Sequence, residues 1–70
     1  MNPMSVKVDQ DNSRLCFETS ADRARIYILE EIIFDQTGKA VRFVGYYTQD
    51  GLKRQIGVNA DQLTWMGDAL

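Results

Sequence analysis

Apolar and polar residues alternate along most of the chain, which is the pattern of half-buried β-strands. Residues 4–8 and 14–18 each place apolar side chains at every second position, and the polar cluster DQDNS at 9–13 separates them. Asp and Asn favour turns because their side chains bond the neighbouring backbone. We therefore expect these two segments to form a β-hairpin.

Residues 25–34 are rich in isoleucine and tyrosine, and a turn-like DQTG follows them at 35–38. A helix that starts after Ser20 is an alternative, because Ala24, Ile28 and Ile32 lie on one helical face. We favour a strand, since β-branched and aromatic residues suit strands and the turn suits a hairpin. The choice between strand and helix for residues 21–34 stays open at this point.

A second turn-like segment, TQDG at 48–51, has the same chemistry as the first. Glycine at the last position of each supplies the positive φ of a three-residue hairpin loop. The two turns predict a three-stranded meander at roughly 25–34, 40–48 and 52–58. In this register Asp35 lies opposite Lys39, and Thr48 lies opposite Leu52.

The C-terminal segment changes its period. Asn59 and Gln62 have the spacing of a helix capping box. Leu63, Met66 and Leu70 then follow at helical spacing, which predicts a helix at about 60–69. The expected fold is mainly β (α+β): a single domain, 1–70, with a five-stranded antiparallel meander sheet or small barrel and one C-terminal α-helix.

The predicted register gives the meander two apolar faces. One is aliphatic and suits the C-terminal helix. The other carries Tyr27, Leu29, Ile33, Val41, Phe43 and Tyr47, with Lys53, Gln55 and Gly57 on its third strand. Three fates are open for this aromatic face: cover by the N-terminal hairpin in a barrel, cover by a second copy, or exposure to a ligand. A slip of one residue exchanges the two faces, and a bulge near Glu30 changes half of one strand.

Composition excludes most catalytic chemistry. The 70 residues include no histidine and one cysteine, so they offer no imidazole base, no imidazole or thiolate metal site and no internal disulfide. We expect no enzyme activity, no metal and no cofactor. The lone Cys16 and the lack of a signal-peptide pattern favour the cytoplasm, and the apolar runs are too short to cross a membrane.

The binding candidates are aromatic and basic residues of the predicted sheet. They are Tyr27, Phe43, Tyr47, Lys53, Arg25 and Arg42. Rings that stack on bases and cations that follow phosphates are the components of a surface for single-stranded nucleic acid. The passage LKRQIGVNADQL, residues 52–63, is similar to the strand-to-helix stretch of a family of single-stranded-DNA-binding coactivators. That resemblance implies the same kind of surface here.

The net charge of -2 disfavours a nucleic-acid partner, because such partners need a positive field. The first hypothesis is therefore a small regulatory or adaptor protein that binds another protein, as a homodimer, through a strand edge or the aromatic face. A single-stranded nucleic-acid-binding module is the alternative. The two differ in salt response, since only phosphate binding weakens steeply as salt rises.

Overall fold

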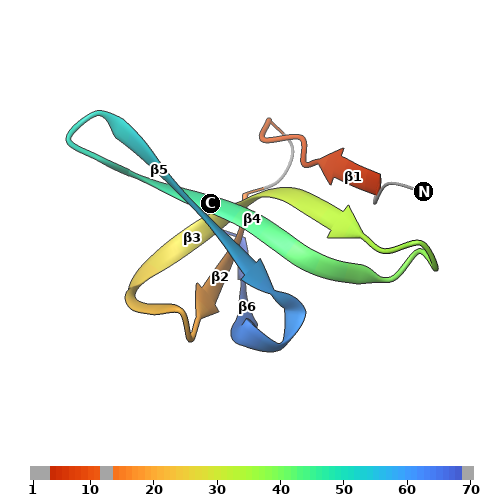
Figure 1. Ribbon diagram of the computed structural model, residues 1–70. Helices are drawn as coiled ribbons and strands as arrows, with labels where there is room; N and C mark the ends of the chain where they lie inside the picture. Colours follow the sequence, from red (N-terminus) through yellow and green to blue (C-terminus); the bar gives the residue numbers. More distant parts are fainter. Residues whose placement is uncertain (1–3, 12–13, 69–70) are drawn as a thin grey trace.

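The computed structural model describes residues 4–11 and 14–68. Within these residues the chain forms six strands and one short 3₁₀ helix (Figure 1). They are β1 (Met4–Lys7), β2 (Leu15–Thr19), β3 (Asp22–Phe34), β4 (Ala40–Gln49), β5 (Leu52–Asn59), η1 (Ala60–Gln62) and β6 (Leu63–Asp68). Residues 21–34 thus contain a strand, and the expected mainly-β, antiparallel architecture is confirmed.

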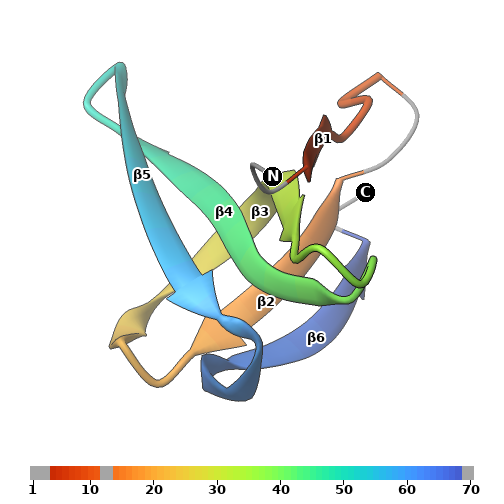
Figure 2. The same ribbon diagram turned by 45° about the vertical axis from the view of Figure 1, so that its right-hand side comes forward.

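The strands form one open antiparallel sheet in the order β5-β4-β3-β2-β6. The chain returns through η1, so the last strand pairs with β2 rather than with the strand before it. Figure 2 shows β5 and β6 at opposite ends of this strand order. The two described strands that end the sheet are therefore consecutive in sequence.

The predicted hairpin between the first two strands is wrong. β1 pairs with the C-terminal part of β3, where Val6 lies opposite Ile32, and β2 pairs with the N-terminal part, where Phe17 lies opposite Tyr27. β3 has 13 residues, so one of its edges is long enough for both short strands. The tight turn between Thr19 and Asp22 closes a β2–β3 hairpin instead.

The predicted C-terminal helix is also wrong. The helical turn ends at Gln62, and Leu63 already has extended dihedral angles, φ -124 and ψ 136. The predicted capping box is present, and in it the Asn59 backbone N–H donates to Gln62 Oε1 at 3.0 Å. The next residues, including Trp65, pair with β2, so tertiary pairing overrides helical spacing here. Most of the predicted helix is a sixth strand.

The two predicted hairpin loops have different outcomes. The first loop is confirmed: the Asp35 N–H donates to the Lys39 carbonyl at 2.9 Å, and Gly38 has φ 87. The second is wrong by one residue, because Gln49 rather than Thr48 lies opposite Leu52. Asp50 and Gly51 both have positive φ, 52 and 76, as in a two-residue type I′ turn. This slip exchanges the two faces of β5.

The register between β3 and β4 contains two irregularities. One lies between Ile33 and Phe34, and the other lies between Leu29 and Glu31, so that Glu30 is an extra residue in its strand. The possible bulge near Glu30 is therefore present. Between the two irregularities Ile32 lies opposite Phe43, which places Ile32 beside the core.

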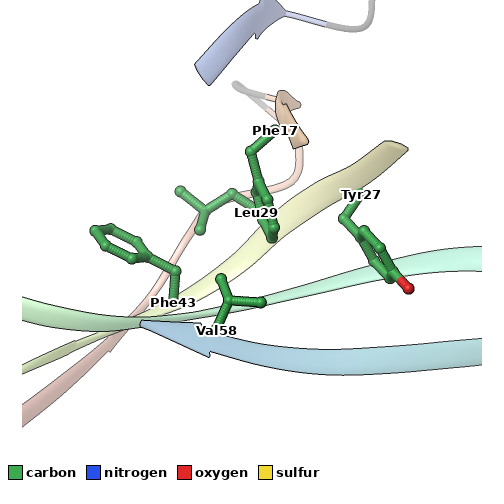
Figure 3. Packing of buried hydrophobic residues seen from close by; sticks show 5 residues of the cluster. All are labelled: Phe17, Tyr27, Leu29, Phe43 and Val58. Carbon is green, nitrogen blue, oxygen red and sulfur yellow. The ribbon is translucent and has the colours of Figure 1, made fainter. Parts of the chain in front are cut away.

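The core lies on the inner face of the curled sheet, which is called the concave face below. This face carries Phe17, Tyr27, Leu29, Phe43 and Val58. Figure 3 shows Val58 between Phe43 and Tyr27, with Phe17 and Leu29 packed beside it. Gly45 makes room for this arrangement, because a Cβ atom there would lie 2.4 Å from Cζ of Phe17. Side chains from four strands of the same chain thus pack together on the aromatic face.

Candidate functional site

Two of the predicted binding residues belong to the core. Tyr27 is 3% exposed and Phe43 is 8% exposed. The Phe43 ring also contacts the Trp65 ring edge-on, with centroids 5.4 Å apart. Neither ring offers an open face on which a nucleic-acid base could stack.

Tyr47 is the predicted ring that stays partly exposed. Its ring meets Tyr27 edge-on at 5.4 Å, and the Arg25 guanidinium lies 4.7 Å from its centroid. Arg25 Nη2 also lies 3.5 Å from Oε1 of Gln49, a long hydrogen bond. The structure therefore brings Arg25, Tyr27 and Tyr47 together, with the Arg25 guanidinium over the Tyr47 ring.

The other two predicted cations lie on the opposite face of the sheet. Lys53 donates to Glu30 and sits 4.7 Å from the centroid of the Tyr46 ring. Arg42 donates to Oδ1 of Asn59 at 2.9 Å and to the Gly57 carbonyl at 3.3 Å. Both guanidinium and ammonium groups therefore have partners, and neither cation joins the aromatic cluster.

A row of side chains crosses the sheet on its concave face. It begins at Arg54 on β5, which pairs with Tyr47, and continues through Tyr27 to Phe17, which pairs with Trp65 on β6. The Phe17 ring contacts Tyr27 at 5.8 Å and Trp65 at 6.1 Å. The middle of the row is buried, and its two ends lie on β5 and β6, the end strands of the sheet order.

The sequence-based register misses Arg54. A three-residue loop at the second turn predicts the other face for its side chain, whereas the two-residue turn places Arg54 opposite Tyr47. The dipeptide Asp50-Gly51 was the available signal, since Asp-Gly favours a type I′ turn of two residues.

The β5 edge is long and regular. All eight residues, Leu52–Asn59, pair with β4 without a register shift, and no described strand pairs with the other side of β5. Such an edge presents a row of free N–H and C=O groups. It carries Lys53 and Arg54 and no acidic residue, and Leu52 is 58% exposed. Its geometry allows another strand to be added.

The β6 edge is short and irregular. Its register with β2 shifts between Cys16 and Phe17, which leaves Met66 as an extra residue next to Gly67 with φ 95. Bulges twist an edge away from further pairing. The edge is apolar instead: Trp65 is 44% and Met66 is 49% exposed.

Hydrogen bonds shift the pKa values of two carboxyl groups near these features. Tyr27 donates to Oδ2 of Asp22 at 2.5 Å, which lowers the pKa of Asp22. Burial and this bond together raise the pKa of Tyr27 to about 12. On the other face, the bond from Lys53 lowers the pKa of Glu30, with a further contribution from Gln55. The Lys53–Glu30 contact joins β5 to β3, whereas the Tyr27–Asp22 bond lies within β3.

An open polar pocket of about 300 Å³ lies where the β2–β3 turn approaches β6. Its lining residues are Glu18, Thr19, Ser20, Arg23 and Thr64. In the part of the chain that the structure describes, no three His, Cys, Asp or Glu side chains gather as a metal site would need. The same part has no helix that combines the length and apolar character required to span a bilayer.

Comparison of the chain with protein-family models, with curated proteins and with solved structures gave no match.

Proposed function

We propose that this protein is a small, non-enzymatic regulatory or adaptor protein that binds another protein through the β5 edge. The observation that supports this proposal is the edge itself: eight regular residues that pair with β4 on one side and with no described strand on the other. Main-chain hydrogen bonds to such an edge give affinity, and the alternating side chains give selectivity.

The homodimer in this proposal uses a different surface. Phe17 and Trp65 of the same chain pack against the aromatic face and cover its centre, so a second copy cannot dock there. The exposed apolar side chains of β6, Trp65 and Met66, are the more suitable contact because they carry no charge that a second copy would repel. We therefore place self-association at β6 and partner binding at β5.

Site-specific photo-cross-linking tests the partner-binding proposal. A photoreactive side chain at Leu52 reports on the β5 edge, and the same group at Thr37, in the exposed turn between β3 and β4, is the matched control. In the cells that express the protein, we expect Leu52 to cross-link one identified protein that also binds the purified chain. Equal products from both positions would contradict the proposal.

Light scattering over a wide concentration range tests the dimer. We expect a dimer whose mass falls to that of a monomer in Met66→Lys, because a charge there would have to be buried between two copies. Leu52→Lys is the control and should leave the mass unchanged. A wild-type monomer at every concentration would remove the dimer from the proposal.

Single-stranded nucleic acid is the second candidate, and Arg25 and Arg54 beside Tyr47 favour it. Stacking a base on Tyr47 would require Arg25 to leave the ring. This candidate predicts oligonucleotide binding that weakens steeply with salt and is lost in Tyr47→Ala. Oligonucleotide affinity that is unchanged in Tyr47→Ala would count against it.

A further inference from the structure

The two cations of the β5 edge, Lys53 and Arg54, differ in whether a carboxylate neutralises them. Lys53 is paired with Glu30 on the convex face. Arg54 lies on the concave face and is exposed, and its side chain makes no hydrogen bond or ion pair with the side chains of the described residues. Arg25 lies on the same face, two strands away, above Tyr47. Arg25 interacts electrostatically with Asp22, whereas the Arg54 side chain forms no ion pair with a described carboxylate. The concave side of this edge therefore carries the unneutralised positive charge of Arg54.

We propose that the β5 edge binds an acidic segment of a partner protein in extended conformation, added to the sheet as one more strand. This inference rests on the proposed function and names the chemistry of the partner. Side chains of the added strand would alternate between the two faces. A carboxylate would lie beside Arg54, and an apolar side chain would lie beside the half-buried Ile56 on the same face.

Charge complementarity favours this occupant over a second copy. A second β5 strand would bring another Lys53 and another Arg54 to the same edge and no acidic residue. Like charges facing each other across strands are destabilising. Nucleic acid fits the edge less well, because phosphates only accept hydrogen bonds, whereas a strand edge both donates and accepts.

A designed octapeptide is the probe. The acetylated, amidated and fluorescently labelled sequence TVTVTETV, paired antiparallel with β5, places its glutamate opposite Arg54 and a valine opposite Ile56. The control peptide TVTVTKTV has lysine in place of glutamate. We expect wild-type protein to bind the glutamate peptide about tenfold more tightly, a difference of roughly 1.4 kcal/mol between attraction and repulsion.

A charge exchange locates the contact. Arg54→Glu should reverse the preference, so that the lysine peptide binds more tightly. Arg14→Glu makes the same change at an exposed residue just before β2, on the β6 side of the sheet, and should keep the wild-type preference. Because Arg14 and Arg54 are exposed, we expect both variants to fold, and their circular dichroism spectra verify this.

Backbone methylation tests strand addition without any change to the protein. Two glutamate peptides, methylated at alternate amide nitrogens in complementary patterns, remove N–H groups from opposite edges of the added strand. One pattern should abolish binding and the other should retain it. Equal binding of both peptides would overturn strand addition.

The remaining outcomes separate this inference from the proposed function. Equal affinity for the glutamate and lysine peptides, with specific cross-linking from Leu52, overturns the acidic partner and leaves the proposed function standing. A wild-type dimer that Arg54→Glu dissociates assigns the edge to a second copy. Displacement of the peptide by oligothymidylate with a steep salt dependence assigns it to nucleic acid.

Discussion

The two end strands of the sheet order, β5 and β6, differ in almost every property that governs binding. β5 has eight residues in unbroken register and two cations, whereas β6 has six residues, a bulge at Met66 and exposed apolar side chains. The first presents an ordered backbone to a partner. The second presents side chains but twists its backbone away.

Both edges are connected to one core in different ways. Trp65 reaches from β6 onto Phe17 and Phe43, and the last core residue of β5 is Val58, near the end of that strand. The start of β5 carries no core residue and continues from a turn that Figures 1 and 2 show projecting from the rest of the sheet. The comparison shows that β5, the edge suited to strand addition, is also the edge whose first half contributes no residue to the buried core.

The largest expected effect tests this difference in anchoring. Trp65→Ala should lower the free energy of unfolding by about 3 kcal/mol, because the ring packs on two core phenylalanines but is partly exposed. Leu52→Ala, at the exposed start of β5, should change it by less than about 0.5 kcal/mol. Urea unfolding measures both. Similar costs at the two edges would remove the contrast between them.

A smaller effect is expected at Tyr27, in the middle of the row that joins the edges. Tyr27→Phe removes the bond to Asp22 and should cost about 1 kcal/mol at neutral pH. The folded-state pKa of Tyr27 is about 12 against an ordinary 10.0, so stability should fall as pH rises from 10 toward 12. The variant should lack the contribution of Tyr27 to this decline.

Tyrosinate absorbance and unfolding at several alkaline pH values measure this prediction. The fall in stability above pH 10.0 should be shallower in the variant than in the wild type. Equal slopes for the two proteins would show that Tyr27 ionises as freely when folded as when unfolded.

The smallest expected effect concerns Glu30 and Lys53, which tie β5 to β3. The pKa of Glu30 is lowered from 4.5, so its contribution is present above pH 4.5 and is lost as pH falls through the folded-state pKa. Because Lys53 is 49% exposed, Glu30→Gln should cost only about 0.5 kcal/mol at neutral pH.

Amide hydrogen exchange localises that effect. At neutral pH, Glu30→Gln should speed exchange in β5 and leave β6 unchanged, and the difference from wild type should shrink in acid. Faster exchange in β6 as well would mean that the ion pair stabilises the whole sheet rather than one edge.

Local signals predicted much of the fold. The strand at 25–34, the antiparallel meander and the loop closed by Gly38 follow from β-branched residues and turn chemistry within a few positions of each other. The same signals failed at the second turn, where Asp50 takes a left-handed conformation. The resulting two-residue turn shifts the register of β5 by one residue, which places Arg54 rather than Lys53 on the aromatic face.

The candidate site was predicted only in part. Alternation correctly grouped Tyr27, Phe43 and Tyr47 on one face, but it could not show that the first two are covered by Phe17 and Trp65 from elsewhere in the chain. The resemblance of residues 52–63 to a strand-to-helix stretch predicted a helix that the structure replaces with η1 and β6. Which strands form the edges of the sheet follows only from the strand order, which the sequence pattern does not give.

The sequence by itself determined the antiparallel β character of this protein and its lack of imidazole and paired-thiol chemistry, because alternation, turn residues and composition act locally. The tertiary structure decided which segment pairs with β3, that residues 63–68 form a strand, and which face each β5 residue occupies. These outcomes depend on pairing between distant segments. A one-residue change in register there exchanges every side chain, so no local pattern determines them.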